Sequence, residues 1–413
     1  ETGLIFRTDA MAQIEIVPVE GLSRFTTFCK LPRLLYRGMS GFVPPLDVER
    51  WTLFAHRLNP HYKLVEEQKF LARRNGEWVG RIAAQIYKDM VPVGASPAQF
   101  GALDAIDDVD VVRALLAAAE DWLRARDAER VSGPFSPSIN SECGLLVEGH
   151  QATPMFLMPW HPAYLGRHLD ALGYEKARDL ISYRWGVADK KLDEKPRFSL
   201  RKEWNERLKV RTIDMSRLKT QETPIMTELF NDAWRGNWGY VPFTKEEFDS
   251  TADGLKLIMP PDYGLVVELD GTPRSFVVAL PNFCEIIADL NGRLFPFGWL
   301  KLISRMRSHC FMSVRIALLG TSKTLQNSAT GGLILMTIVE EARRRGASSP
   351  GQHLEAGWVL EDNMAMRRPI EMFGGKVDKI HRIYERRLTA PASVALRDGS
   401  RVDDNVASQD SGS

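Results

Sequence analysis

The chain has 413 residues, 44% of them hydrophobic, so it is long enough for two or three ordinary domains, each with its own core. Its 54 Lys and Arg residues against 53 Asp and Glu residues leave a net charge of +1, which argues against a nucleic-acid partner because such proteins carry a strong positive field. Four widely separated cysteines form neither a CxxC pair nor a Cys/His cluster. The sequence therefore indicates no metal site and no disulfide framework, and it favours a reducing, cytoplasmic location.

The two ends of the chain differ in composition from the rest. Met11 has the position of a native start, and we interpret residues 1–10 as leader or tag. Residues 389–413 are polar and predict a disordered tail. The apolar stretch from Leu333 to Val339, interrupted only by Thr337, is far shorter than the roughly 20 residues that span a bilayer. We expect a cytoplasmic protein whose contact with the inner membrane, if it has one, is peripheral.

Two stretches nearly repeat each other at an offset of about 200 residues, which is the size of a domain. YRGMSGFVPPL begins at Tyr36 and WRGNWGYVPFT begins at Trp234; Arg, both Gly, Val and the first Pro recur at the same spacing. The similarity continues beyond these phrases. Asn75-Gly76 and Asp270-Gly271 each stand between two runs of alternating apolar residues, and such a pair is a strong signal for a β-hairpin.

Helices and strands follow the hairpins in the same order in both halves. Apolar residues at helical spacing predict helices at 110–127 and 331–346, the second ended by Gly346. Both halves close with a helix, a glycine and a strand. The hairpins imply antiparallel pairing and the strand-helix-strand units imply parallel pairing, so the sequence predicts an α/β (α+β) mixed sheet in each half. The predicted divisions are an N-terminal domain at 11–187, a charged linker at 188–208 and a C-terminal domain at 209–388.

The second half contains a candidate anion-binding turn. A buried strand ends near Gly320, a polar turn follows, and a helix begins near Ala329. Unpaired N–H groups and the dipole at the start of a helix favour a phosphate there, and small residues allow it to approach the backbone. A helix cap without a ligand is the alternative interpretation.

This turn resembles the coenzyme A loop of the GCN5-related N-acetyltransferase (GNAT) superfamily, Q/R-x-x-G-x-G/A, with Gln326 first and Gly331 last. Ala329 replaces the first glycine of that pattern. Asn363 and Gly374, around the closing helix, also match the family spacing. The resemblance implies two tandem GNAT-like domains and a binding site for acyl-CoA as co-substrate. The residues expected in that site are Leu319, Gly320, Gln326, Asn327, Ser328, Ala329, Thr330, Gly331, Gly332 and Asn363.

The first half has no such loop. Asp104, Asp107, Asp108 and Asp110 occupy the corresponding stretch, and their carboxylates repel phosphates; capping of the next helix is their more ordinary role. We expect the first domain to be a degenerate copy and the second alone to hold acyl-CoA.

In the GNAT family the thioester lies in a gap between the fourth and fifth strands, where a backbone N–H polarises its carbonyl group. By resemblance, the gap lies between 316–319 and 356–360, and the N–H of Leu318 or Leu319 has this role. The base that takes the amine proton is expected among Glu361 and Asp362, followed by Glu355, with helix capping as the alternative.

Many family members place a Tyr seven residues after the conserved Asn as the acid for the thiolate. Here that position is Ile370. Either Tyr384 or His381 takes the role, or the thiolate leaves unaided.

The helices after the first strand usually form the acceptor site in this fold. The candidate substrate-binding residues are Asn231, Trp234, Asn237, Trp238 and Tyr240. Packing in the core is an equal alternative for the two tryptophans. Asn237 and Trp238 are the stronger candidates because the first copy has Met39 and Ser40 in their places.

Two further segments stand out. An insertion at 291–312 predicts a helix with an apolar face (Trp299, Leu302, Ile303, Met306) opposite Lys301 and Arg305, suited to a membrane surface or to covering an acyl chain. Packing against the first half is the alternative. The loop at 135–149 carries Asn140, Glu142 and Cys143 without an evident structural purpose; for Cys143, a buried structural thiol is favoured over a nucleophile.

Phrases along the whole chain, including LPRLLYRG, GPFSPSIN, NGRLFPFGWLK and MRRPIEMFGG, resemble a bacterial tandem-GNAT family that includes bacterial ceramide synthases. This resemblance implies transfer of a long-chain acyl group from acyl-CoA to the amine of a sphingoid base. Two alternatives remain open: an acetyltransferase acting on a small amine or peptide, and a non-catalytic acyl-CoA-binding protein.

Overall fold

A computed structural model describes residues 13–186, 202–256, 258–346 and 352–388. The predicted segments 1–10 and 389–413, and residues 188–201 of the predicted linker, lie outside the described residues. The remainder of the predicted linker forms a short helix, α6 (Lys202–Arg207), and begins the next strand.

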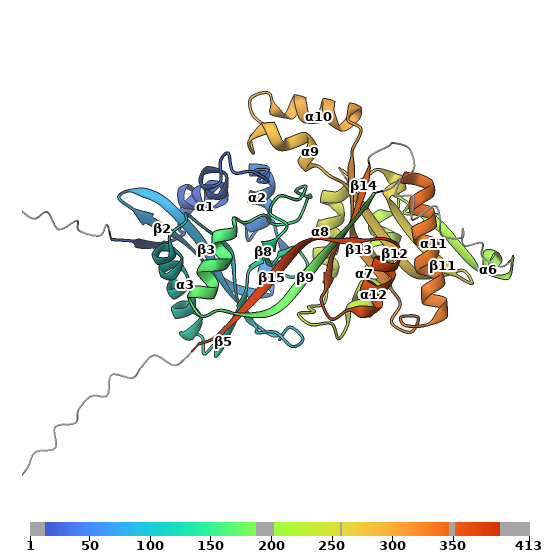
Figure 1. Cartoon of the computed structure of the whole chain (residues 1–413), viewed down its shortest axis with the longest axis horizontal. Coiled ribbons are helices and arrows are strands. Elements are labelled where there is room, and N and C mark those ends of the chain that lie inside the picture. Colours follow the sequence, from blue (N-terminus) through green and yellow to red (C-terminus); the bar gives the residue numbers. More distant parts are fainter. Residues whose placement is uncertain (1–12, 187–201, 257, 347–351, 389–413) are drawn as a thin grey trace, which may run out of the picture.

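The elements of the first half lie together on one side of the molecule (Figure 1). Its helix α3 packs against β2 and β3, because apolar residues spaced three and four apart, such as Val111, Leu115 and Ala119, form a buried face. Its elements are β1 (Glu15–Pro18), α1 (Gly21–Leu35), α2 (Asp47–Phe54), η1 (Pro60–Lys63), β2 (Val65–Arg74), β3 (Glu77–Tyr87), β4 (Ala98–Ala105), α3 (Val109–Arg124), β5 (Arg130–Gly133), β6 (Phe135–Ser136), β7 (Glu142–Cys143), β8 (Leu145–Glu148), α4 (Ala163–Ala171) and β9 (Glu175–Gly186).

The second half repeats this order and adds the predicted insertion between its third and fourth strands, which confirms the duplication. Its elements are β10 (Leu208–Thr212), η2 (Leu218–Glu222), α7 (Thr223–Trp234), α8 (Lys245–Lys256), η3 (Pro261–Tyr263), β11 (Gly264–Leu269), β12 (Thr272–Pro281), α9 (Cys284–Ile287), η4 (Ala288–Leu290), α10 (Gly298–Ser308), β13 (Ser313–Thr321), α11 (Ala329–Gly346), β14 (His353–Leu360), α12 (Met364–Met372) and β15 (Lys376–Arg387).

The two halves share one mixed sheet because they exchange their last strands. The order is β1-β2-β3-β4-β5-β15-β9-β14-β13-β12-β11-β10, with β8 also paired to β15. Strand β9 of the first half pairs with β14 of the second, and β15 of the second half pairs with β5 of the first. Figure 1 shows β9 and β15 side by side across the middle of the molecule. The predicted division into 11–187 and 209–388 follows the order along the chain, whereas these ladders join the halves in space.

The predicted hairpins are confirmed, with two-residue turns between β2 and β3 and between β11 and β12. The residues Asn75, Gly76, Asp270 and Gly271 all have positive φ angles, at 51°, 83°, 51° and 79°. A tight type I′ turn requires positive φ at both central residues, which Asn-Gly and Asp-Gly tolerate at little cost.

The repeated phrases have a backbone explanation. Gly38 and Gly41 in the first copy, and Gly236 and Gly239 in the second, all have positive φ, between 73° and 92°. Residues with a Cβ are strained in this region, so both copies keep glycine. The aromatic residue that begins each phrase differs in its surroundings: Tyr36 is fully buried in the first-half core, whereas Trp234 lines a cavity.

Candidate active site

Strands β13 and β14 separate at the position that the sequence predicts. They pair in parallel only from Ser313 with His353 to Ile316 with Ala356, and β14 continues along β9 alone. On its other edge, β13 has a bulge at Ala317, because Val278 pairs with Leu318 while Ala279 pairs with Ile316. A bulge re-aims backbone groups away from the ladder. The sheet therefore opens next to Leu318 and Leu319, the residues expected to polarise the thioester carbonyl.

A cavity of about 1740 Å³ passes through this opening, since residues from β13, β14, α7, α11 and α12 all line it. We call the part of its lining that comes from α7, α8, β12 and the insertion the apolar arm, because its side chains are mostly nonpolar. Phe230, Phe248, Ile258, Leu280, Phe283 and Leu302 line that arm. Another part of the lining, which includes Gln326, Asn327 and Gly331, comes from the predicted coenzyme A loop and the start of α11.

The loop before α11 keeps N–H groups available for an anion. Asn327, Ala329 and Thr330 have no hydrogen-bond acceptor for their N–H among the described residues, and Asn327 turns the chain with φ at 61°. A Cβ on Gly331 would lie 2.1 Å from the carbonyl oxygen of Leu325, so glycine is required there. The residues present fit the diphosphate of coenzyme A.

Three other predicted members of this loop hold its shape. Ser328 Oγ donates to Leu325 O at 2.6 Å and accepts from the N–H of Gly331 at 3.0 Å. The N–H of Gly332 is bonded to Ser328 O. The amide of Gln326 donates to Ala233 O at 3.0 Å and to Thr321 O at 2.9 Å. These contacts position the turn against α7 and leave the N–H groups of Asn327, Ala329 and Thr330 free to bind an anion.

The corresponding opening in the first half is filled by its own chain. A Cβ on Gly101 in β4 would lie 1.5 Å from the carbonyl oxygen of Phe135, and the N–H of Ala102 is bonded to Ser136 Oγ at 3.0 Å. Asp108 caps α3 through the N–H of Asp110, the role expected of these aspartates, whereas Asp104 is buried in β4 and pairs with Arg81. The first copy thus has no space for a thioester between β4 and β5.

Of the predicted bases, Asp362 alone lines the cavity. Asn363, expected to bind acyl-CoA, also lines the cavity and caps α12 by accepting the N–H of Met366. Glu361 instead binds Lys176 Nζ at 2.6 Å and the N–H of Asp179, which ties β14 to β9. Asp362 is 57% exposed and lies 3.7 Å from Arg178, so it stands at the rim.

The structure does not bring the two candidate acids to the cavity. Tyr384 is 1% exposed in the first-half core, and burial raises the pKa of its hydroxyl to about 12. His381 is fully buried, with Nε2 2.9 Å from Pro159 O, and burial lowers its pKa to about 3. The strand exchange carries β15 and both residues toward the first half.

The candidate acceptor residues separate into two groups. The side-chain amide of Asn231 is satisfied by hydrogen bonds within the protein. Its NH₂ group donates to Phe243 O, and its oxygen accepts from the N–H of Phe243 and the hydroxyl of Tyr240. Trp234, Asn237, Trp238 and Tyr240 line the cavity. The indole N–H of Trp234 donates to Leu319 O at 3.3 Å, which places that ring directly beside the opening.

The first half contributes a polar wall of the cavity that the sequence did not assign. Arg50 binds both oxygens of Glu142 and also donates to Glu49 Oε1 at 2.8 Å, and all three residues line the cavity. The loop with Asn140 and Glu142 stood out in the sequence, but Glu49 lies in an ordinary amphipathic helix without a distinguishing pattern. Cys143 is 2% exposed, and burial raises the pKa of its thiol, in agreement with a structural role.

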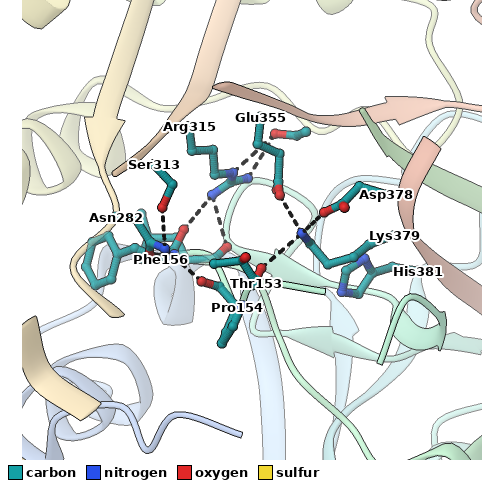
Figure 2. A network of polar contacts seen from close by, with 12 residues as sticks. Thr153, Pro154, Phe156, Asn282, Ser313, Arg315, Glu355, Asp378, Lys379 and His381 are labelled. Atoms are coloured by element: carbon teal, nitrogen blue, oxygen red, sulfur yellow. Dashed lines mark hydrogen bonds and ion pairs between the residues drawn. The ribbon is translucent and has the colours of Figure 1, made fainter. Parts of the chain in front are cut away.

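A polar network at the paired part of β13 and β14 joins the halves (Figure 2). Arg315 in β13 donates to the carbonyl oxygens of Phe156 and Leu157 from the first half and to Gly357 O in β14. Lys379 binds Glu355 and the carbonyl oxygen of Thr153. Burial raises the pKa of Glu355 despite the lysine. Glu355 is therefore part of this network and does not line the cavity.

Solved structures share this architecture. The chain has a TM-score of 0.53 to a tandem GNAT protein from the clavulanic acid biosynthesis pathway, with 12% identity, covering 91% of this chain and 99% of that one. A conserved protein of unknown function from Enterococcus faecalis V583 also gives 0.53, with 10% identity, over 92% of this chain and 74% of the other. The fold is that of a tandem GNAT protein.

Sequence relatives identify the family. The chain is 38% identical over 382 residues to the bacterial ceramide synthase of Caulobacter vibrioides, covering 91% of this chain and 98% of that protein. It is 37% identical over 365 residues to protein YghO of Escherichia coli K12, covering 87% and 92%. No family model matches. The chain belongs to the bacterial tandem-GNAT family that includes the bacterial ceramide synthase, and it is an acyltransferase. Acyltransferases of the GNAT type use acetyl- or acyl-CoA as co-substrate.

Proposed function

We propose that the protein transfers a long-chain acyl group from acyl-CoA to the amine of a sphingoid base, at the cytoplasmic surface of the inner membrane. The observation that carries this proposal is the apolar arm of the cavity. Ligand pockets are commonly ~300–1,000 Å³, whereas this cavity holds about 1740 Å³. An acetyl group and a small amine need far less space. The name of the relative from Caulobacter vibrioides points to the same substrate class.

In this proposal coenzyme A lies along α11, with its diphosphate at the N–H groups of Asn327, Ala329 and Thr330. Lys323, an exposed residue of the same turn, also lines the cavity and supplies a positive charge there. The acyl chain occupies the apolar arm, and the thioester carbonyl meets the backbone N–H groups next to the bulge at Ala317.

The amine nitrogen attacks the thioester carbon, the C–N bond forms and the C–S bond breaks. Before attack, the acceptor ammonium must lose a proton to a base. We propose Glu49 for this step in preference to Glu361 and Asp362. Glu49 lines the cavity with 23% of its side chain exposed. Arg50 holds both oxygens of Glu142 but is bonded to Oε1 alone of Glu49. Burial raises the pKa of the Glu49 carboxyl. The positive charge of Arg50 lowers this pKa, and the negative charge of Glu142 raises it further.

The position of Glu142 links this wall to the opening. Cys143, the next residue in the chain, contacts the side chain of Trp358 in β14, and Arg315 interacts electrostatically with both Glu142 and Cys143. In this proposal the acceptor amine approaches the opening from the side of these first-half carboxylates. The second proton of the attacking nitrogen leaves with the thiolate as free coenzyme A, and Glu49 returns its proton to water.

The test compares palmitoyl-CoA with acetyl-CoA, each with and without sphinganine, by release of free thiol and by detection of the amide. Thiol release that requires both palmitoyl-CoA and sphinganine supports the proposal. Preferred turnover of acetyl-CoA with small amines, or binding of palmitoyl-CoA without amine-dependent turnover, would replace it with the alternative activities.

A further inference from the structure

The insertion between β12 and β13 presents an apolar surface to solvent. Helix α10 has no buried residue and stands out from the sheet at the top of Figure 1. Phe295 is 81% exposed and Phe297 is 69% exposed, which is unusual for side chains of this size. We call the following exposed residues the insertion surface: Phe295, Phe297, Trp299, Leu300, Ile303 and Met306.

The insertion is held firmly in this position. Arg33 of the first half donates to Asn291 O at 3.0 Å, and the N–H of Asp47 donates to Gly292 O at 2.8 Å. Leu302 packs inward with the residues of α9. The predicted contact with the first half is therefore made by the base of the insertion, while most of the predicted apolar face of α10 points outward.

The part of the insertion that holds this surface carries basic residues and no acidic ones. Residues 290–312 contain Arg293, Lys301, Arg305 and Arg307 but no Asp or Glu, although the whole chain has a net charge of only +1. Asp289, just outside, is bonded to Arg305 and lies 3.5 Å from Lys301. Arg293 and Arg307 have no ion pair with any described residue. Exposed apolar side chains together with the two unpaired cations Arg293 and Arg307 complement an anionic lipid surface.

The cavity reaches the underside of the same helix. Leu294, Leu302 and Met306 line it together with Phe283 and Ile287 of the adjoining apolar arm. Met306 is also 36% exposed and belongs to the insertion surface. The surface and the apolar arm are therefore continuous, which gives a lipid a route from a bilayer into the cavity without crossing water.

We propose that the insertion surface docks on an anionic phospholipid bilayer and delivers the lipid acceptor into the cavity beneath α10. This inference rests on the proposed function for the identity of the acceptor, but the docking itself needs no turnover. In the described part of the chain, no helix has both the length and the apolar composition to cross a bilayer. The contact is interfacial: Phe295, Phe297 and Trp299 enter the headgroup region, and Arg293 and Arg307 face lipid phosphates.

The test measures binding of the full chain to sucrose-loaded vesicles of phosphatidylcholine alone or mixed with phosphatidylglycerol. We expect the wild type to bind the anionic vesicles, with affinity that falls as salt rises. The double variant Phe295→Ser/Phe297→Ser should lose at least about tenfold in vesicle partitioning. Arg293→Glu/Arg307→Glu should lose binding to anionic vesicles selectively. Val91→Ser, an equally exposed apolar change in the first half at 68% exposure, is the matched control and should bind normally.

Unfolding midpoints and mass by light scattering accompany these measurements. All four replaced side chains are exposed, so unchanged midpoints are expected. Equal vesicle binding by the wild type and both double variants, or no binding by the wild type, overturns the inference. A wild-type dimer that Phe295→Ser/Phe297→Ser converts to a monomer also overturns it, because a second copy is then the occupant. Vesicle binding that depends on these residues, without acylation of sphinganine, contradicts the proposed function but supports the docking surface.

Discussion

Replacing Gly331 by alanine tests the coenzyme A loop directly. The added Cβ would lie 2.1 Å from the carbonyl oxygen of Leu325, so the turn must move by about 1.3 Å to reach the 3.4 Å of ordinary contact. Hydrogen bonds to phosphate tolerate only a few tenths of an ångström. Each charge-assisted bond that is lost costs about 1.5–3 kcal/mol, or roughly 10- to 150-fold in Kd. We expect a loss of coenzyme A affinity in this range.

The assay is calorimetric titration of the wild type and the variant with coenzyme A, accompanied by thermal unfolding. Gly332→Ala is the comparison, because it adds the same methyl group to the same helix with nothing within 4 Å of the new Cβ. Its loss should be at least about tenfold smaller, since the clash is absent. Wild-type affinity in Gly331→Ala, or equal losses in the two variants, would refute the assignment of the diphosphate to this turn.

Three further changes test the rest of the site. Glu49→Gln should lower kcat/KM for the amine by roughly 10²–10⁴. Because a base acts only when deprotonated, wild-type kcat/KM should fall as pH drops through the raised pKa of Glu49. The variant should not show this acidic decrease, and its kcat/KM should recover at alkaline pH, where the amine is already neutral. Arg315→Ala leaves one buried and two partly buried carbonyl oxygens without donors and should reduce the free energy of unfolding in urea by about 3–5 kcal/mol. The exposed Arg307→Ala should change it by less than about 0.5 kcal/mol; similar values for both would contradict the role of the network. Ile258→Trp, in the apolar arm, should lower kcat/KM for palmitoyl-CoA at least about tenfold more than for acetyl-CoA, and a uniform decrease would place the acyl chain elsewhere.

Much of the fold follows from local patterns in the sequence. Asn75-Gly76 and Asp270-Gly271 specify their hairpins because positive φ angles are inexpensive for these residues. The strand-turn-helix around Gly331 is equally local, since the unpaired N–H groups and the small residues lie within a few positions of one another. The repeated glycines at 38, 41, 236 and 239 record the duplication for the same reason.

The sequence by itself determined the order of elements, the duplication and the turn before α11, because each depends on residues that are neighbours in the chain. The tertiary structure alone decided which strands exchange, and hence that Tyr384 lies in the first-half core while Glu49 and Glu142 reach the cavity of the second half. Pairing between β9 and β14 joins residues more than 160 positions apart. No periodicity within a strand specifies so distant a partner, because the free energy of that choice comes from packing across the whole sheet.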